Sequence, residues 1–142
     1  GAPILSIFGG KLTTYRKLAE HALEKLAMVI SIQNKKWTDQ EKLPGGDISD
    51  TDLFNDLIPA KMKERFDQTY GNQISKLYSS FIDCKEGGIK LTEDLYEFEI
   101  AYLVKEEMAS SVEDILFRRT KLGISFPKDK VNILNDVLKK YL

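Results

Sequence analysis

Apolar residues recur at three- and four-residue spacing along most of the chain, which is the period of an amphipathic helix. The first stripe predicts a helix over about residues 12–32, and its members are Tyr15, Ala19, Ala22, Leu26 and Val29. Residues 33–51 are polar and contain Pro44-Gly45-Gly46, so this segment is predicted to be a linker. The hydrophobic pattern therefore favours a mainly α fold.

From residue 51 to the C-terminus, further stripes separated by Gly and Pro predict a compact helical bundle without a sheet. These stripes are Met62, Phe66 and Tyr70; Ile74, Leu77, Tyr78 and Phe81; and Val131, Leu134, Leu138 and Tyr141. Thr92 is placed to cap a further helix that includes Leu95 and Phe98. Ser111, followed three residues later by Asp114, forms another helix-capping pattern.

The first residues of the chain have a different pattern. Pro3–Phe8 is almost continuously apolar, which is typical of a short strand buried on both faces of a sheet. No second strand of comparable quality follows it, although such a strand needs a partner. We therefore expect the chain to be the C-terminal piece of a longer protein.

Composition excludes several functions. The chain has 142 residues, and its 21 Lys and Arg against 22 Asp and Glu give a net charge of −1. No nucleic-acid partner is expected, because nucleic-acid binding requires a basic excess or a basic face. Cys84 and His21 are the single cysteine and histidine, which excludes an internal disulfide and a Cys-based zinc site. One unpaired cysteine fits a reducing compartment, so we expect the protein to be cytoplasmic.

The Gly9-Gly10-Lys11 junction before the first helix is the first candidate site. Two glycines allow another molecule to approach the backbone, and a helix start offers unpaired N–H groups. Lys11 adds a positive charge, and Thr13 and Thr14 add hydroxyls, so the junction suits a phosphate, a carboxylate or an anionic ring oxygen. The alternative is a tight turn with a surface lysine.

Arg118-Arg119-Thr120-Lys121 is the second candidate. A cluster of cations can bind a phosphate, an acidic surface or an anionic lipid. The favoured alternative is that these residues complement the dipole of their own helix, whose first turn carries Glu113 and Asp114. We also expect at least one of the two arginines to face another part of the longer protein.

No metal site is expected. Asp47, Asp50 and Asp52 lack the glycine and glutamate positions of a calcium-binding loop, so helix capping is their favoured role. His21 lies within a predicted helix without a second imidazole or a thiolate nearby in the sequence.

Several separated blocks resemble one family, the FAD-dependent glycerol-3-phosphate dehydrogenases and the related α-glycerophosphate oxidases. The blocks occur in the family's order and span nearly the whole chain: Ile4–Glu20, Leu43–Gly46, Thr69–Gly71, Leu95–Glu99, Tyr102–Val104 and Asp114–Gly123. The resemblance implies that residues 1–12 are the end of an FAD-binding domain, with one short strand left over from it. Residues 13–142 then resemble the helical C-terminal cap domain, with the linker near residues 33–51.

The resemblance also implies roles for the junction. Its residues that lie beside the flavin in the family correspond to Gly9, Gly10, Leu12, Thr13 and Thr14. The family's lysine near the substrate corresponds to Lys11. No residue of this chain is assigned a catalytic role.

The implied activity is FAD-dependent oxidation of sn-glycerol 3-phosphate to dihydroxyacetone phosphate, with electrons passed to quinone or oxygen. The implied partners are the protein's own FAD-binding domain and the substrate. A second copy of the chain, in a homodimer, is a further possible partner. The G-x-G-x-x-G fingerprint that holds the FAD pyrophosphate is absent. We therefore expect this chain alone to be inactive and without bound FAD. A non-catalytic helical interaction module is the competing function, and peripheral contact with the inner face of the cell membrane is the alternative location.

Overall fold

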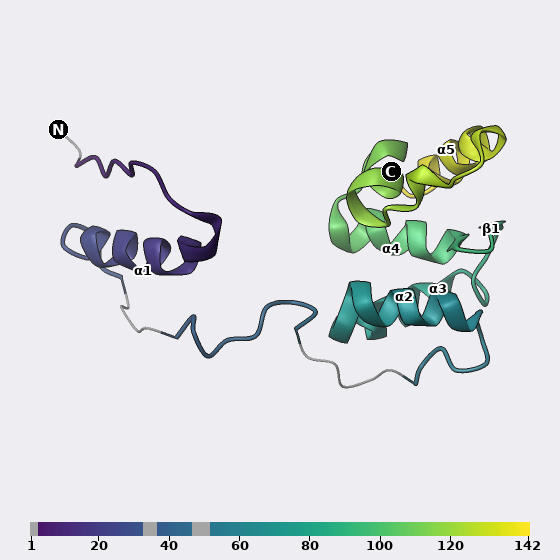
Figure 1. Cartoon of the computed structure of the whole chain (residues 1–142), viewed down its shortest axis with the longest axis horizontal. Helices are drawn as coiled ribbons and strands as arrows, with labels where there is room; N and C mark the ends of the chain where they lie inside the picture. The colour runs from purple at the N-terminus through teal and green to yellow at the C-terminus, as the bar shows by residue number, and fades with distance from the viewer. Residues whose placement is uncertain (1–2, 33–36, 47–51) are drawn as a thin grey trace. The chain divides into compact units, whose positions relative to one another are not determined.

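The computed structural model of the chain describes residues 3–32, 37–46 and 52–142. The chain divides into two compact units, Gly1–Glu41 and Lys42–Leu142. Figure 1 shows the first unit in purple and blue and the second in blue through green to yellow.

The first unit contains a short 3-10 helix, Leu12–Thr14, which leads into α1, Tyr15–Leu26. The predicted first helix is therefore correct in position, but it ends before Ile32. No residue of α1 is buried, and Met28, Val29 and Ile30 after it are exposed. Helices in proteins are stabilised mainly by packing of an apolar face. Because the apolar residues after Leu26 are not packed in this unit, they do not stabilise a longer α1.

The expected strand over Pro3–Phe8 is absent from this structure. These residues precede the first helical turn without regular secondary structure, and Ile4 and Phe8 are 90% and 93% exposed. A strand exists through its hydrogen bonds to a neighbouring strand, and no described residue pairs with this segment. The apolar pattern of Pro3–Phe8 therefore does not produce a strand among the described residues.

The second unit is helical, as predicted. Its helices are α2, Ala60–Tyr70; α3, Ile74–Asp83; α4, Glu97–Glu107; and α5, Val131–Lys139. Shorter helical turns cover Gly71–Gln73, Leu122–Ile124 and Lys128–Lys130, and Asp114–Arg119 is a π-helix. Figure 1 shows α4 between α2 and α3 on one side and α5 on the other. The mainly α fold class is confirmed.

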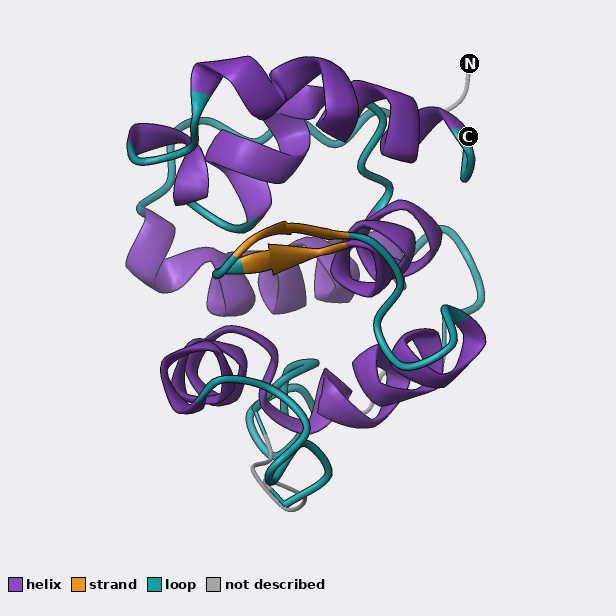
Figure 2. Ribbon diagram, turned by 90° about the vertical axis from the view of Figure 1, so that its right-hand side faces the viewer, coloured by secondary structure: helices purple, strands orange, loops and turns teal. Residues whose placement is uncertain are grey.

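A small hairpin corrects the expectation of a bundle without a sheet. Strands β1, Lys90–Thr92, and β2, Leu95–Tyr96, pair antiparallel directly before α4 (orange in Figure 2). The Thr92 hydroxyl accepts a hydrogen bond from the Asp94 backbone N–H at 3.2 Å, so this side chain closes the hairpin turn instead of capping a helix. Leu95 is a buried residue of β2 and does not belong to the helix that was predicted to contain it.

Gly71 ends α2, and its backbone lies close to that of the segment that precedes this helix. The φ of Gly71 is +50°, and a Cβ there would collide with the Gly45 carbonyl oxygen. The Gly45 backbone N–H also donates to Asn72 Oδ1 at 2.9 Å. Only glycine fits at position 71, because any side chain would collide with this neighbouring backbone.

The apolar core of the second unit is rich in aromatic rings. The predicted faces of α2 and α3 are buried, with Met62, Phe66 and Tyr70 on α2 and Ile74, Leu77 and Phe81 on α3. Phe54, from the turn before α2, lies at the centre of the rings and is fully buried. The segment around Phe54 is a series of turns over residues 52–57.

One ion pair lies inside this core. Glu99 on α4 is fully buried, and both its oxygens accept hydrogen bonds from Arg65 on α2 at 2.7 Å. Arg65 also donates to the Asp94 carbonyl at 2.8 Å, which ties the hairpin turn to α2. Burial and the Glu99 carboxylate raise the pKa of Tyr70 well above its usual value, so the phenol stays protonated. Its hydroxyl donates a hydrogen bond to Glu99.

Candidate functional site

The glycine junction forms an open turn in front of α1. Gly9 and Gly10 have φ values of +77° and +143°, and Lys11 is extended. The Thr14 backbone N–H and hydroxyl both donate to the Lys11 carbonyl, at 3.0 and 3.2 Å. Thr14 therefore closes the turn with its hydroxyl. The first N–H groups of a helix have no partner within it, so those of Leu12 and Thr13 face outward from the helix start.

The surroundings of the junction leave its backbone accessible. A Cβ at Gly9 would meet no atom within 4 Å, whereas one at Gly10 would lie 3.1 Å from a methyl group of Leu18. Lys11 and Leu12 are exposed, and Leu12 is 88% accessible. The structure thus brings together one flexible cation, outward N–H groups and a glycine that leaves room for an approaching group. This is a surface suited to an anionic or planar partner.

The cations of the basic cluster bind acceptors in their own segment and at the end of α4. Arg118 donates to Asp114 at 2.7 Å, and Arg119 donates to the Glu107 carbonyl at 2.6 Å. Lys121 donates to the carbonyls of Phe117 and Arg118 at 2.8 and 3.2 Å. The three cations therefore have different acceptors and do not converge on one ligand. This arrangement favours the predicted stabilisation of the helix end over an anion site.

Ser111 and Asp114 form the predicted capping box. The Ser111 backbone N–H donates to Asp114 Oδ2 at 3.0 Å, and the Asp114 N–H donates to the Ser111 hydroxyl at 3.1 Å. The Ser110 backbone N–H adds a third bond to the same carboxylate. Hydrogen bonds from Ser110 and Ser111 and the Arg118 guanidinium hold the pKa of Asp114 well below its usual range.

Replacement of Asp114 by asparagine is expected to make a pH-dependent difference to stability. The folded-state pKa of Asp114 is below its unfolded value of about 3.9, so its contribution is fully present above that value. It is lost as the pH falls toward the folded-state pKa. Urea unfolding at neutral pH should therefore show Asp114→Asn less stable than the parent chain, and the gap should narrow below about pH 4. Asp136→Asn, at an exposed position, is the control, and a gap that widens in acid would contradict the prediction.

The described residues contain no cluster of three or more His, Cys, Asp or Glu arranged to hold a metal ion. Asp52 accepts a hydrogen bond from Asn55, while Asp47 and Asp50 lie outside the described residues. In the described part of the chain, no helix combines the length and the apolar character needed to cross a membrane.

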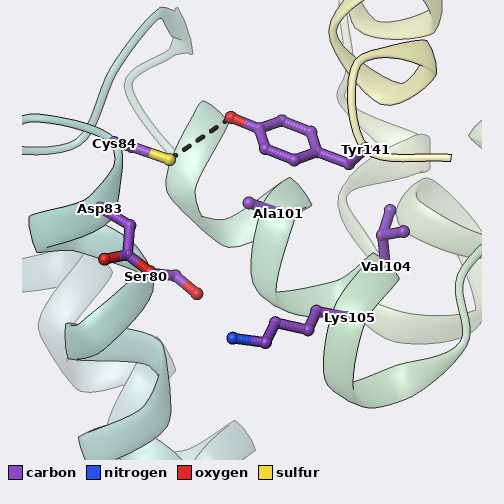
Figure 3. A pocket seen from close by; sticks show the side chains of 7 residues that line it. All are labelled: Ser80, Asp83, Cys84, Ala101, Val104, Lys105 and Tyr141. Atoms are coloured by element: carbon purple, nitrogen blue, oxygen red, sulfur yellow. Dashed lines mark hydrogen bonds between the residues drawn. The ribbon is translucent and has the colours of Figure 1, made fainter.

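Sequence patterns did not reveal a cavity of about 450 Å³ in the second unit. It lies where α3 and α4 meet the end of the chain, and Ser80, Cys84, Lys105 and Tyr141 are among the residues that line it (Figure 3). These residues come from three separate segments, so no local motif could have brought them together.

The chain belongs to the family described as the C-terminal domain of alpha-glycerophosphate oxidase, which matches residues 36–140. The resemblance based on the separated sequence blocks is therefore confirmed. This match includes the whole of the second unit except its last two residues, Tyr141 and Leu142.

Curated relatives are similar over most of the chain. Aerobic glycerol-3-phosphate dehydrogenase of Escherichia coli (strain K12) is 36% identical, over 99% of this chain and 30% of the relative. Glycerol-3-phosphate dehydrogenase of Pseudomonas tolaasii is 40% identical, over 87% of this chain and 26% of the relative. D-erythritol 1-phosphate dehydrogenase of Brucella abortus (strain 2308) is 35% identical, over 85% and 26%. The chain thus spans less than a third of the length of each of these relatives.

Proposed function

We propose that this chain is the C-terminal part of an FAD-dependent enzyme that oxidises sn-glycerol 3-phosphate to dihydroxyacetone phosphate. The observation that carries the proposal is the similarity of almost the whole chain to the aerobic glycerol-3-phosphate dehydrogenase of Escherichia coli. The family match over residues 36–140 supports the same class of enzyme. The electrons pass from the flavin to a quinone or to oxygen.

A different polyol phosphate is the second candidate substrate, because the Brucella abortus relative is named for D-erythritol 1-phosphate. The full-length protein should be assayed with both substrates, and a higher kcat/KM for glycerol 3-phosphate supports the first proposal. The reverse preference would overturn the substrate assignment. Hydrogen peroxide production in the same assay identifies oxygen as the acceptor, and activity that requires a quinone identifies the other class.

The open turn before α1 has a surface that fits contact with a flavin. We assign this contact to Gly9, Gly10, Leu12, Thr13 and Thr14, whose backbone is accessible at Gly9 and outward-facing at the helix start. When bound, FAD supplies the acceptor for the hydride that leaves the substrate's carbinol carbon. The chain's own contribution is to hold an anionic group with backbone N–H donors and the charge of Lys11.

The helical second unit is proposed to dock against the enzyme's own FAD-binding domain. The competing function is a non-catalytic interaction module that serves another partner, including a second copy in a homodimer. Flavin retention separates these functions, since the full-length enzyme should purify with FAD and this chain alone should not. We place the enzyme in the cytoplasm, with peripheral contact with the inner face of the cell membrane as the alternative.

Lys11 is proposed to attract the substrate phosphate and to stabilise negative charge that develops beside it. Its flexible stem suits point-charge attraction, and its exposed position leaves the ammonium free to meet a ligand. Lys11→Met in the full-length enzyme is expected to lower kcat/KM by at least about 10-fold, or about 1.4 kcal/mol, with FAD still bound. Lys17→Met is the matched control, because Lys17 is also exposed but lies on α1 beyond the turn, and it should leave kcat/KM near the parent value. Equal kinetics for the two variants would remove Lys11 from the site.

A further inference from the structure

The cavity of about 450 Å³ beside Cys84 is lined by groups of several chemical kinds. Ser80, Asp83 and Cys84 come from the end of α3, Lys105 from α4 and Tyr141 from the end of the chain (Figure 3). Ala101 and Val104 supply apolar wall. A cavity of this size accommodates a small polar molecule.

Ser80 is the observation that points to a ligand. The residue as a whole is only 8% exposed, and its hydroxyl makes no hydrogen bond with any described residue. Ser79, the residue before it, donates to the Ser75 carbonyl one turn back, at 3.2 Å, as helical serines commonly do. In Figure 3 the Ser80 hydroxyl points instead into the space beside α4. The hydroxyl opens onto the cavity and has no partner among the described residues, so it is available to a molecule held there.

The two charged residues of the cavity have opposite signs. Asp83 and Lys105 both line it, and neither forms an ion pair or hydrogen bond through its side chain with another described residue. Their neighbours are different in this respect, since Lys76 on α3 pairs with Glu106 on α4 at 3.1 Å. A ligand with both a carboxylate and an ammonium group would complement this pair of charges.

Cys84 places a thiol at the wall of the same cavity. Its sulfur lies 3.4 Å from the Tyr141 hydroxyl, and that hydroxyl donates to the Glu97 carboxylate at 2.9 Å. The single hydroxyl proton of Tyr141 lies in its hydrogen bond to Glu97. The thiol is therefore the donor in its contact with Tyr141. The side chain of Cys84 is half-buried, so a molecule held in the cavity reaches its sulfur without unfolding the unit.

We propose that this cavity is a site at which Cys84 forms a mixed disulfide with an amino-acid thiol, delivered as the disulfide of that thiol. The Cys84 thiolate attacks one sulfur of the incoming disulfide, and the sulfur–sulfur bond of that reagent breaks as the new one forms. The departing half leaves as a thiolate and takes up the proton that Cys84 released. Cys84 is oxidised, and the departing half is reduced. Lys105 holds the carboxylate of the retained half, while Asp83 and Ser80 hold its ammonium group.

Cystine is the probe, because each half carries one carboxylate and one ammonium group on a small frame. The folded chain is incubated with cystine, with cystamine, which lacks the carboxylates, or with 3,3'-dithiodipropionate, which lacks the ammonium groups. Intact-mass spectrometry follows the adduct, and Cys84 is the single cysteine of the sequence. The same chain unfolded in urea gives the intrinsic rate for each reagent. For each reagent, the rate with the folded chain is divided by the rate with the unfolded chain. This ratio should be about fivefold higher for cystine than for the other two reagents.

Variants test whether the cavity provides this preference. Lys105→Met and Asp83→Asn should each remove most of the preference, and Ser80→Ala should reduce it. Lys85→Met is the matched control, because Lys85 follows Cys84 directly but does not line the cavity. The proposal is overturned if folded and unfolded chains rank the three reagents alike. It is also overturned if Cys84 stays unmodified, or if Lys85→Met has the same effect as Lys105→Met.

Discussion

Replacement of Arg65 by methionine is expected to destabilise the unit of residues 42–142 by about 3–5 kcal/mol, because it leaves the buried Glu99 carboxylate without its counter-ion. Glu99 is fully buried, and both of its oxygens accept hydrogen bonds from the Arg65 guanidinium. Tyr70 donates to the same carboxylate, but a neutral hydroxyl cannot replace the lost charge. Urea unfolding followed by far-UV circular dichroism measures the effect. The fluorescence of Trp37 is less suitable, since this residue belongs to the other unit.

Two further variants separate the buried charge from the loss of a long side chain. Lys76→Met removes the cation of the more exposed Lys76–Glu106 pair and should cost at most about 1 kcal/mol. The double variant Arg65→Met with Glu99→Gln removes both charges and leaves Tyr70 an acceptor, so it should recover part of the stability lost in Arg65→Met. If the double variant is less stable than Arg65→Met, the unpaired carboxylate is not the cause.

Helix faces were predictable from the sequence because they depend on spacing within one element. Met62, Phe66 and Tyr70 lie three and four residues apart, and α2 buries all three, as the 3.6-residue period requires. The Ser111–Asp114 capping box was equally local, and the structure contains both of its hydrogen bonds. These parts of the fold follow from neighbouring residues alone.

The hairpin was missed because Thr92 is compatible with two local structures. A threonine three residues before an acidic or apolar segment suits a helix cap, but its hydroxyl also accepts a bond two residues on in a turn. The Arg65–Glu99 pair was missed for a different reason. These residues are 34 positions apart in the sequence, and only the packing of α2 against α4 brings them together.

The two candidate sites differ in the same way, because one is built from contiguous residues and the other from residues far apart in the sequence. Gly9, Gly10 and Lys11 are contiguous, so the sequence could mark the junction before α1, and the structure shows its open backbone. The cavity beside Cys84 combines α3, α4 and the end of the chain. No spacing in the sequence marks such a convergence, because each segment contributes residues that are ordinary in their own context.

Phe54 is the position where tertiary packing most clearly overrides local pattern. It lies in turns before α2 and is fully buried. Its ring contacts those of Phe66, Tyr78, Phe81 and Phe98, with centroid separations of 5.3–5.8 Å. One aromatic side chain from a turn thus joins the rings of α2, α3 and α4.

Phe54→Ala is therefore expected to lower the free energy of unfolding of the second unit by about 3–5 kcal/mol, through lost burial and the cavity left among the rings. Leu57→Ala in the same turn segment is the matched control, because Leu57 is 50% exposed and its truncation leaves the aromatic cluster intact. Its cost should be under about 1 kcal/mol. Phe54→Leu should recover part of the loss, since leucine refills some of the volume. Equal midpoints in urea for Phe54→Ala and Leu57→Ala would show that this ring does not hold the helices together.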